Sequence, residues 1–387
     1  MQDQRFQGEL DNLRRLGLFR QMRTVSAAGG RRVRIQGREK IVFGSNNYLG
    51  LARHARIIEA VKAGLDCWGF GAGGSRLVCG NTEVHEHLQK RLANLLRKEA
   101  ALIFPSGYQA NFSALSTLAG EGDLIVMDKL VHASLIDGAC ASGAMVRTYP
   151  HKQTGKLQRL LEIGNFDQAI IVTDSLFSMD GDFANLKELV EIKENYNALL
   201  LVDEAHAFGC VGPDGLGRAA ETGVLEDVDI YIVTFSKALG GAGGAVVCSQ
   251  TVADYLVNRA RGFIYSTAIP AVSCLAAEAA LDVVATESER QERLWENAQY
   301  LRHCFREMEL NLGATESYII PIILGSGEKA VAVSQQLFDQ GFLVPAIRPP
   351  TVPPASSRLR ISVMSEHTKE DLEKLCNALR RILVSAI

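Results

Sequence analysis

The chain has 387 residues, of which 47% are hydrophobic and 22% charged, and its formal net charge is −3. A chain of this length predicts either two linked domains or one large domain with an appendage. A charge so close to neutral lacks the positive surplus expected of a nucleic-acid-binding protein, so we exclude that class.

Neither a membrane span nor a metal site is expected. The longest uncharged stretch, residues 100–120, is interrupted by proline, glycine and amide side chains, which is unlike a membrane helix. The eight cysteines are scattered, with no Cys-x-x-Cys pair, and His85 and His87 would lie on different faces of a helix. Such cysteines are typical of core residues in a reducing compartment, so we expect a cytoplasmic protein.

In chain order, the first expected element is an amphipathic helix within residues 5–25, where leucines and Phe19 recur at helical spacing between arginines. From about residue 100 to residue 250 the pattern changes to short apolar runs separated by helical stretches. Runs that are apolar throughout are typical of strands buried on both faces of a largely parallel sheet. They comprise residues 101–104, 124–127, 169–172, 199–202, 230–233 and 245–247.

The C-terminal part of the sequence has a different pattern. It is helical from Pro270 to about Leu310, and residues 319–324 and 359–363 then have the pattern of strands. A capping box at residues 368–371 opens the last helix. We therefore predict an α/β protein in three parts: an N-terminal helix and arm (1–45), a large α/β domain with a mostly parallel sheet (46–285) and a small C-terminal α+β domain (286–387).

Polar residues directly follow two of the expected strands. Lys237 comes after residues 230–233 and before a glycine-rich stretch, while Asp203 and His206 come after residues 199–202. Because ligands of parallel α/β sheets bind beyond the carboxyl ends of the strands, we expect these side chains at one site. An amine nucleophile, a carboxylate and an imidazole are the groups that hold pyridoxal 5′-phosphate (PLP), with the lysine forming a Schiff base. The pattern therefore predicts a PLP enzyme.

Other signals in this region have plain structural alternatives. The turn at Ser106 and Gly107 opens a helix and can bind a phosphate, although it can also be an ordinary strand-to-helix turn. Asp203 taken alone can be a helix N-cap, and His132 can be structural or can stack on a cofactor ring. The glycine-rich residues 69–76 do not follow a strand, so we interpret them as an active-site loop rather than a dinucleotide site.

Several motifs occur in the order that is found in one protein family. The chain resembles the α-oxoamine synthases, a branch of the fold-type-I PLP-dependent transferases with the aspartate-aminotransferase-like fold. The resemblance covers nearly the whole chain. The motifs are residues 45–51, 73–76, 132–134, 177–182, 203–206, 234–237 and 265–267.

The resemblance implies a role for many residues in these motifs. Lys237, His132 and Asp203 would be catalytic: Lys237 would bond to the cofactor, His132 would stack on its ring and Asp203 would meet the pyridine nitrogen. Thr267 would reach the phosphate from the partner subunit of a homodimer with shared active sites. Cofactor binding is implied for Gly107, Tyr108, His132, Ser178, Asp203, His206, Thr234, Lys237 and Thr267.

Substrate binding is implied for a second set of residues. Arg360 would bind the carboxylate of the amino acid, and Arg20, or Arg23 in its place, would approach the acyl chain. The set comprises Arg20, Asn46, His132, Thr351 and Arg360. The proline-rich residues 348–354 form a stiff loop that can present anion-binding side chains.

Within the family, residues 346–353 most resemble the members that join L-alanine to a pimeloyl thioester, on coenzyme A or a carrier protein, in biotin synthesis. The resemblance thus implies a PLP-dependent C-acyltransferase that releases carbon dioxide and a thiol. Sister synthases that use glycine with a short acyl group, or serine with a long one, remain alternatives. A non-catalytic cofactor-binding subunit is a further alternative, which the intact Lys237, Asp203 and His132 disfavour.

Overall fold

The computed structural model describes residues 3–384, so the outermost residues of the expected parts 1–45 and 286–387 lie outside the described residues. The chain forms two compact units. The central unit consists of residues 49–178 and 183–291, and the terminal unit consists of the residues up to 48, residues 179–182 and those from 292 onward. The N-terminal residues group with the C-terminal ones because Ile41 and Val42 pair in parallel with Phe342 and Leu343. The expected three-part division stays a prediction.

The central unit is built on a seven-stranded sheet with the order β4-β10-β9-β8-β7-β5-β6. Strand β10 runs antiparallel to both of its neighbours, and the remaining pairs are parallel. The strands are β4 (Ala100–Phe104), β5 (Leu124–Asp128), β6 (Met145–Tyr149), β7 (Ala169–Asp174), β8 (Leu199–Asp203), β9 (Ile230–Thr234) and β10 (Gly244–Cys248). Each apolar run expected to be a strand forms one. The sequence pattern missed β6, because this edge strand is mostly exposed and its Met-Val-Arg-Thr-Tyr sequence is not a continuous apolar run.

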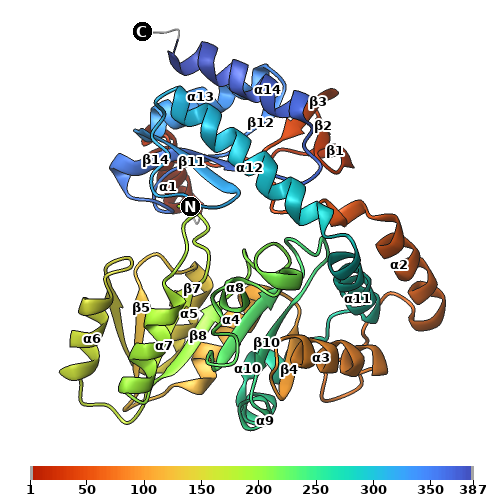
Figure 1. The fold of residues 1–387 in the computed structure, drawn as a ribbon, viewed down its shortest axis with the longest axis vertical. Helices are drawn as coiled ribbons and strands as arrows, with labels where there is room; N and C mark the ends of the chain where they lie inside the picture. The colour runs from red at the N-terminus through yellow and green to blue at the C-terminus, as the bar shows by residue number, and fades with distance from the viewer. Residues whose placement is uncertain (1–2, 385–387) are drawn as a thin grey trace. The chain divides into compact units, whose positions relative to one another are not determined.

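Helices cover the sheet and bury its apolar side chains (Figure 1). Helices α4 and α5 lie side by side over one part of it, where residues such as Phe104 and Leu135 are fully buried. The helices of this unit before α11 are α2 (Ala55–Trp68), α3 (Glu83–Leu95), α4 (Gly107–Leu118), α5 (Ala133–Ser142), α6 (Thr154–Glu162), α7 (Leu186–Asn195), α8 (Arg218–Thr222), α9 (Gln250–Arg259) and α10 (Arg261–Ile264).

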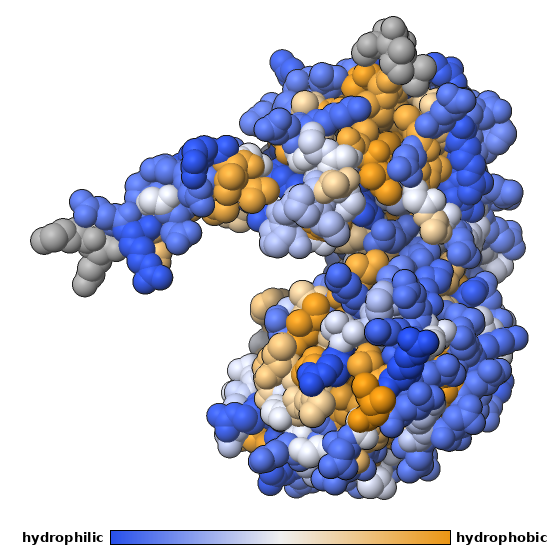
Figure 2. Space-filling model, turned by 90° about the vertical axis from the view of Figure 1, so that its left-hand side faces the viewer, coloured by the Kyte–Doolittle hydropathy of each residue, from blue (hydrophilic) through white to orange (hydrophobic). Residues whose placement is uncertain are grey.

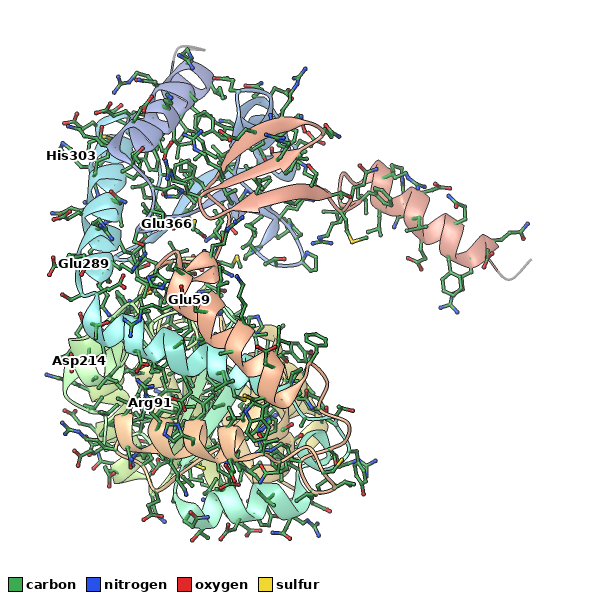
Figure 3. The ribbon with its side chains drawn as sticks, turned by 90° about the vertical axis from the view of Figure 1, so that its right-hand side faces the viewer. Glu59, Arg91, Asp214, Glu289, His303 and Glu366 are labelled. Carbon is green, nitrogen blue, oxygen red and sulfur yellow. The ribbon has the colours of Figure 1, made fainter. Side chains whose placement is uncertain are left out.

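Helix α11 (Ala271–Thr286) packs against α2 and α3. Arg91 of α3, labelled in Figure 3, joins α3 to α11 through ion pairs with Glu278 at 2.8 Å and Asp282 at 2.6 Å. All three side chains are at least partly screened from solvent, so the pairs fix how the two helices lie against each other.

The terminal unit holds a four-stranded sheet, β1-β2-β3-β12, and a three-stranded sheet, β11-β14-β13. The strands expected at 319–324 and 359–363 form β11 and β14. The elements are α1 (Gln4–Arg15), β1 (Val25–Gly29), β2 (Arg32–Ile35), β3 (Arg38–Val42), α12 (Glu289–Glu307), β11 (Ile319–Gly325), α13 (Gly327–Asp339), β12 (Phe342–Leu343), β13 (Ala346–Ile347), β14 (Ser357–Ser362) and α14 (Lys369–Leu379).

The capping box expected at the last helix is present. The Thr368 hydroxyl accepts from the Asp371 N–H at 3.3 Å, and the Asp371 carboxylate accepts from the Thr368 N–H at 3.1 Å. Asp371 also binds the guanidinium groups of Arg31 at 2.7 Å and Arg32 at 3.1 Å, so this buried carboxylate ties α14 to the N-terminal strands.

The N-terminal helix differs from its expected form. Helix α1 forms in the expected region but ends at Arg15, so Phe19 of the expected pattern lies outside it, and none of its residues is buried. Its surface is mostly hydrophilic in Figure 2. The helix ends there because Leu16 and Gly17 leave the helical path, Gly17 with a φ of 65° that suits glycine.

His367 in the terminal unit generates a test of stability against pH. Its Nδ1 accepts the Met364 N–H at 3.0 Å, its Nε2 donates to the Val42 carbonyl at 2.9 Å, and its ring stacks on Phe43. Burial lowers the pKa of His367 from 6.5 to about 4. Between pH 6.5 and about 4, His367 is therefore mostly protonated in the unfolded chain and mostly neutral in the folded chain.

We expect the free energy of unfolding to fall as pH drops from about 6.5 to about 4, by about 3 kcal/mol in total from His367. Urea unfolding of the wild type and of His367→Gln, measured across this range, checks the expectation. The variant keeps one donor and one acceptor but does not titrate, so its stability should depend less on pH. Equal pH dependence in both proteins would contradict the prediction.

Candidate active site

The candidate active site is a cavity of about 220 Å³ in the central unit. It lies where the carboxyl ends of β7, β8 and β9 meet the N-terminal ends of α4 and α5, as expected for a parallel α/β sheet. The residues that line it are Ser106, Gly107, Tyr108, Asn111, His132, Ser134, Asp174, Asp203, Ala205, His206, Thr234, Ser236 and Lys237.

Asp203 is held at the end of β8 by hydrogen bonds to both carboxylate oxygens. Its Oδ1 accepts the Ala205 N–H at 2.8 Å, and its Oδ2 accepts from the Asn111 amide nitrogen at 2.6 Å. The side chain is only 5% exposed. Two donors at short distance stabilise the ionised carboxylate in a buried place, and each oxygen keeps a lone pair for a further donor.

Asp174 lies next to Asp203, because the last residues of β7 and β8 pair directly in the parallel ladder. It accepts a longer hydrogen bond, 3.2 Å, from the His132 N–H. Burial, and next the charge of Asp203, raise the pKa of Asp174 well above its ordinary value. Two neighbouring buried carboxyls do not both ionise readily, so the raised pKa biases Asp174 toward its neutral form.

His132 is the N-cap of α5 and stands partly exposed at the cavity. Its Nδ1 lies 2.7 Å from the Ser134 hydroxyl and accepts the Ser134 N–H at 3.3 Å. The ring of Tyr108 meets it edge-on with centroids 6.5 Å apart. Desolvation lowers the pKa of His132, against the opposing effect of the Asp203 carboxylate, so the imidazole is biased toward its neutral form.

The N-terminus of α4 lies at one end of the cavity. Ser106 caps this helix by accepting the Gln109 N–H at 3.1 Å, and Thr234 and Ser236 place their hydroxyls 2.9 Å apart at the end of β9. A Cβ on Gly107 would come within 3.2 Å of the Thr234 side chain, so glycine lets the helix start approach the strand end. Backbone N–H groups, a helix dipole and two hydroxyls suit a phosphate group.

Lys237 is half-buried and follows β9 in a tight turn. The Gly240 N–H donates to the Lys237 carbonyl at 3.0 Å, and Gly240 has a φ of 65°. A Cβ on Gly240 would lie 2.3 Å from the Ala52 nitrogen, so only glycine fits there. The glycine-rich stretch therefore fixes the backbone that presents the lysine to the cavity.

These residues fit PLP on the chemistry of their donors and acceptors. The cavity offers an amine, a charged carboxylate and a phosphate-binding helix end, which match the aldehyde, the pyridine nitrogen and the phosphate of the cofactor. The buried Oδ1 of Asn111 lacks a hydrogen-bond partner among the described residues, as a polar atom beside an open ligand site can.

The structure brings most of the predicted cofactor residues together and leaves two outside. Gly107, Tyr108, His132, Asp203, His206, Thr234 and Lys237 all line the cavity, whereas Ser178 and Thr267 are not among the described residues that line it. Thr267 instead forms an isolated bridge with Ser75. The individual roles of all these residues stay predictions.

The predicted substrate residues other than His132 lie in the terminal unit. Arg360 is 5% exposed and donates to Asn46 at 3.1 Å and to the Ser362 hydroxyl at 2.7 Å. Arg20 donates to the Pro349 carbonyl at 3.4 Å, in the loop that also holds Thr351. The structure thus forms two groups, one at Arg360 and one at the proline-rich loop.

The competing Arg23 lies elsewhere in the same unit. Its guanidinium donates to Gln335 at 3.2 Å and covers the ring of Phe338, both on α13. Arg20 is therefore the one of the two that reaches the proline-rich loop.

Sequence reasoning missed Asn111, Ser134, Asp174 and Ser236 as site residues. A signal for Asp174 was present, since β7 and β8 both end in aspartate, just as β5 ends in Asp128. Asn111 has no comparable signal, because its contact with Asp203 depends on how α4 packs against the sheet.

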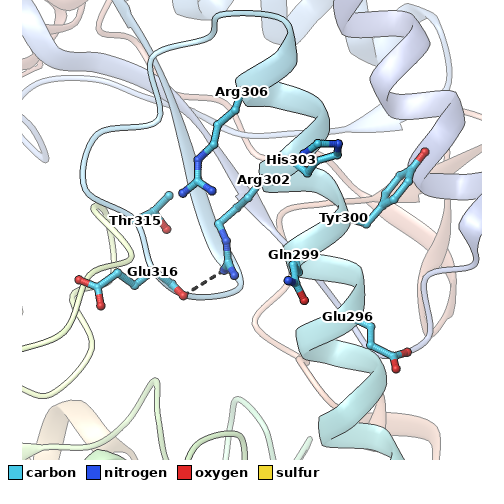
Figure 4. Close-up of a pocket in the computed structure, with 8 residues that line it drawn as sticks. All are labelled: Glu296, Gln299, Tyr300, Arg302, His303, Arg306, Thr315 and Glu316. Atoms are coloured by element: carbon cyan, nitrogen blue, oxygen red, sulfur yellow. Dashed lines mark hydrogen bonds between the residues drawn. The ribbon is translucent and has the colours of Figure 1, made fainter.

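A larger cavity of about 680 Å³ lies in the terminal unit between α12 and the segment before β11 (Figure 4). Arg302 crosses it and donates to the Glu316 carbonyl at 3.0 Å, so this arginine braces the loop. None of the residues expected to be catalytic lines the cavity, and we assign it no catalytic part.

Within residues 3–384, no helix is long and apolar enough to cross a membrane. In the same part of the chain, no group of three or more His, Cys, Asp or Glu residues is arranged to hold a metal ion.

Comparisons with known proteins agree with the site. The model of the aminotransferase class I and II family matches residues 38–379. The 8-amino-7-oxononanoate synthase of Geobacter sulfurreducens is 43% identical over 378 residues, 97% of each chain. A serine palmitoyltransferase from S. paucimobilis, solved with PLP and myriocin, has a TM-score of 0.93 at 29% identity and covers 100% of this chain and 99% of its own. The 8-amino-7-oxononanoate synthase of Francisella tularensis has a TM-score of 0.78 at 29% identity, covering 90% and 99%.

The sheet, the cavity and these similarities define a fold-type-I PLP-dependent transferase. The chain belongs to the aminotransferase class I and II family and, within it, to the α-oxoamine synthases. The fold class and the PLP-dependent acyltransferase class expected from the sequence are thereby confirmed.

The neighbouring carboxyls give a matched pair of variants. Asp203→Asn removes the negative charge and with it one charge-assisted hydrogen bond, worth roughly 1.5–3 kcal/mol. Turnover should therefore slow by about 10- to 150-fold. Asp174→Asn replaces a carboxyl that its raised pKa biases toward the neutral form by an amide of the same shape, so it should change turnover by less than about threefold. Steady-state kinetics with cofactor in excess checks both, and equal losses would show that Asp203 is not the charged partner.

Proposed function

We propose that this protein catalyses the PLP-dependent decarboxylative condensation of L-alanine with a pimeloyl thioester to give 8-amino-7-oxononanoate, in biotin biosynthesis. The similarity to curated 8-amino-7-oxononanoate synthases carries the proposal. It extends over 95–98% of this chain at 40–43% identity, against 29–31% for the serine palmitoyltransferase structures.

The residues at the cavity would bind and orient the cofactor. The N-terminal N–H groups of α4 and the Thr234 hydroxyl would hold its phosphate, and the charged Asp203 would hold a proton on its pyridine nitrogen. The ring of His132 would lie against the cofactor ring and fix its plane. When bound, PLP stabilises negative charge on the α-carbon of an attached amino acid.

Lys237 would carry the proton transfer. Its Nζ would take the proton from the α-carbon of alanine and return a proton after carbon dioxide has left, acting as a general base and then as a general acid. The tight turn at Gly240 limits the freedom of the backbone at Lys237, so the amine is positioned by the fold.

Arg360 would bind the carboxylate of alanine. The guanidinium is buried, and its hydrogen bonds to Asn46 and Ser362 hold the plane in one orientation. A planar guanidinium suits a carboxylate because it can donate two parallel hydrogen bonds.

A serine-using synthase with a long acyl chain is the second candidate. The TM-score of 0.93 to a serine palmitoyltransferase, against 0.78 to the Francisella enzyme, favours it. The thiol carrier, coenzyme A or a carrier protein, and a cytoplasmic location also stay predictions.

Substrate preference tests the proposal. We expect product from L-alanine and pimeloyl-coenzyme A, with less turnover of glycine or serine. Heptanoyl-coenzyme A has nearly the same chain length without the terminal carboxylate, so it should react roughly tenfold less efficiently, the equivalent of about one charged hydrogen bond. Arg20→Gln should reduce this preference, while Arg23→Gln, whose arginine contacts α13, should keep it.

Kinetics with product detection by mass spectrometry measures each of these values. A clear preference for serine with a long acyl thioester, or for glycine with acetyl-coenzyme A, would replace the proposed substrates. Such a result would leave the cofactor chemistry in place.

An exposed apolar surface supports a homodimer. Phe70, Leu77, Val78 and Tyr265 are 75%, 54%, 81% and 72% exposed. Their segments are joined by the bridge between Ser75 and Thr267, so they belong to one region of the central unit. Large apolar side chains gathered at a surface mark a protein interface, and a second copy of this chain would cover them and bring Thr267 to the partner's phosphate site.

Complementation between inactive variants tests the shared site. Lys237→Ala and Thr267→Ala should each be inactive or nearly so, and a mixture after subunit exchange should recover roughly a quarter of the wild-type activity per subunit, because half of the dimers then hold one intact site. Native mass spectrometry verifies the exchange. Mixed dimers without recovered activity would show that each subunit completes its own site.

A further inference from the structure

A continuous chain of hydrogen bonds joins Asp203 to His132 through two side chains that the proposed function does not use. The Asn111 amide nitrogen lies 2.6 Å from Asp203 Oδ2 and 2.9 Å from Ser134 Oγ, and Ser134 Oγ lies 2.7 Å from His132 Nδ1. Asn111 is 2% exposed and Ser134 is fully buried. We call these four side chains the Asp203–His132 relay.

The direction of each bond in the relay follows from the donors available. Ionised Asp203 can only accept, so the amide of Asn111 must turn its nitrogen toward it, and this nitrogen has two hydrogens for its two partners. Ser134 Oγ accepts one of them, which leaves its own hydrogen to donate to His132 Nδ1. The backbone N–H of Ser134 points to the same Nδ1 at 3.3 Å. Two donors meet at Nδ1, so the proton of the neutral imidazole lies on Nε2.

We propose that Asn111 and Ser134 are positioning residues that hold His132 as the neutral imidazole with its proton on Nε2 and its ring plane fixed. The inference rests on the proposed function, in which this ring lies against the cofactor. A positive imidazolium stacked on a pyridine ring that Asp203 keeps protonated would place two like charges face to face. The relay prevents this by using the charge of Asp203 to orient the donors that keep His132 neutral.

Several other groups near His132 affect its protonation, but they do not determine which ring nitrogen carries the proton. The carboxylates of Asp203 and Asp137 favour its protonated form, and the Lys237 amine opposes it. Asp174 accepts the backbone N–H of His132, and Tyr108 offers only a ring edge. The charges around the ring thus oppose one another, whereas both donors at Nδ1 exclude a proton there. The hydroxyl of Ser134 can rotate away, but its backbone N–H cannot.

If His132 has a purely structural role, a different result is expected. As the N-cap of α5, His132 needs only the backbone N–H of Ser134, so the Ser134 hydroxyl and Asn111 would be incidental. Ser113 provides a matched control, because it is also a buried serine beside this core, and its hydroxyl has no partner among the described residues.

Nitrogen-15 NMR of the histidine side chains in the full-length protein, without and with PLP, tests the proposal. The His132 signal is identified by its loss in His132→Phe. In the wild type we expect a bare Nδ1 and a protonated Nε2 at neutral pH. Ser134→Ala removes one donor from the neutral form, so the pKa of His132 should rise by roughly half to one unit, and the tautomer should become mixed. Ser113→Ala should leave both unchanged.

Two results would overturn the proposal: a proton on Nδ1 of wild-type His132 at neutral pH, or equal His132 titration in Ser134→Ala and Ser113→Ala. The first needs only the wild type and the His132→Phe variant that identifies the signal, so it decides even if Ser134→Ala fails to fold. Because the cofactor-free measurement involves no substrate, a failure here is separate from a failure to make 8-amino-7-oxononanoate.

Discussion

The parallel register of β7, β8 and β9 is the constraint on which the site depends. The ladder pairs Asp174 with Asp203 and Asp203 with Ile232, so the carboxyl ends of three strands lie at the same end of the sheet. Side chains that are far apart in sequence meet there. The buried apolar runs that form these strands thereby determine where the amine, the carboxylates and the hydroxyls are placed.

Two carboxyl groups lie side by side at a buried end of the sheet, where ionising both is unfavourable. The fold gives the two groups different hydrogen bonds. Asp203 receives two short hydrogen bonds, while Asp174 receives one longer bond and has a raised pKa. The difference arises from Asn111 on α4, which approaches Asp203. The same helix offers its N-terminus to the other end of the cavity, so in the proposed site a single helix would bind the phosphate and support the carboxylate that meets the pyridine nitrogen.

Much of this arrangement follows from the sequence. Continuous apolar runs give the buried strands, and the polar residues directly after them, Asp203, His206 and Lys237, line the cavity. Edge strand β6 was not predictable in this way, because it faces solvent and its sequence lacks the pattern. Asn111 and Ser134 were missed for another reason: their partners are fixed by helix packing, and a single sequence does not encode which helix faces which strand end in a readable pattern.

The position of β10 bears on how the protein is made. This strand is the partner of both β4 and β9, so β4 has no place in the sheet until residues 244–248 have left the ribosome. Helix α4 directly follows β4, and its N-terminus lines the cavity where we propose that the phosphate binds. More than half of the chain must therefore be synthesised before the cofactor has a complete cradle in the central unit. Contacts so distant in sequence form slowly, and until then the apolar face of β4 is exposed to aggregation or to the chaperones that prevent it.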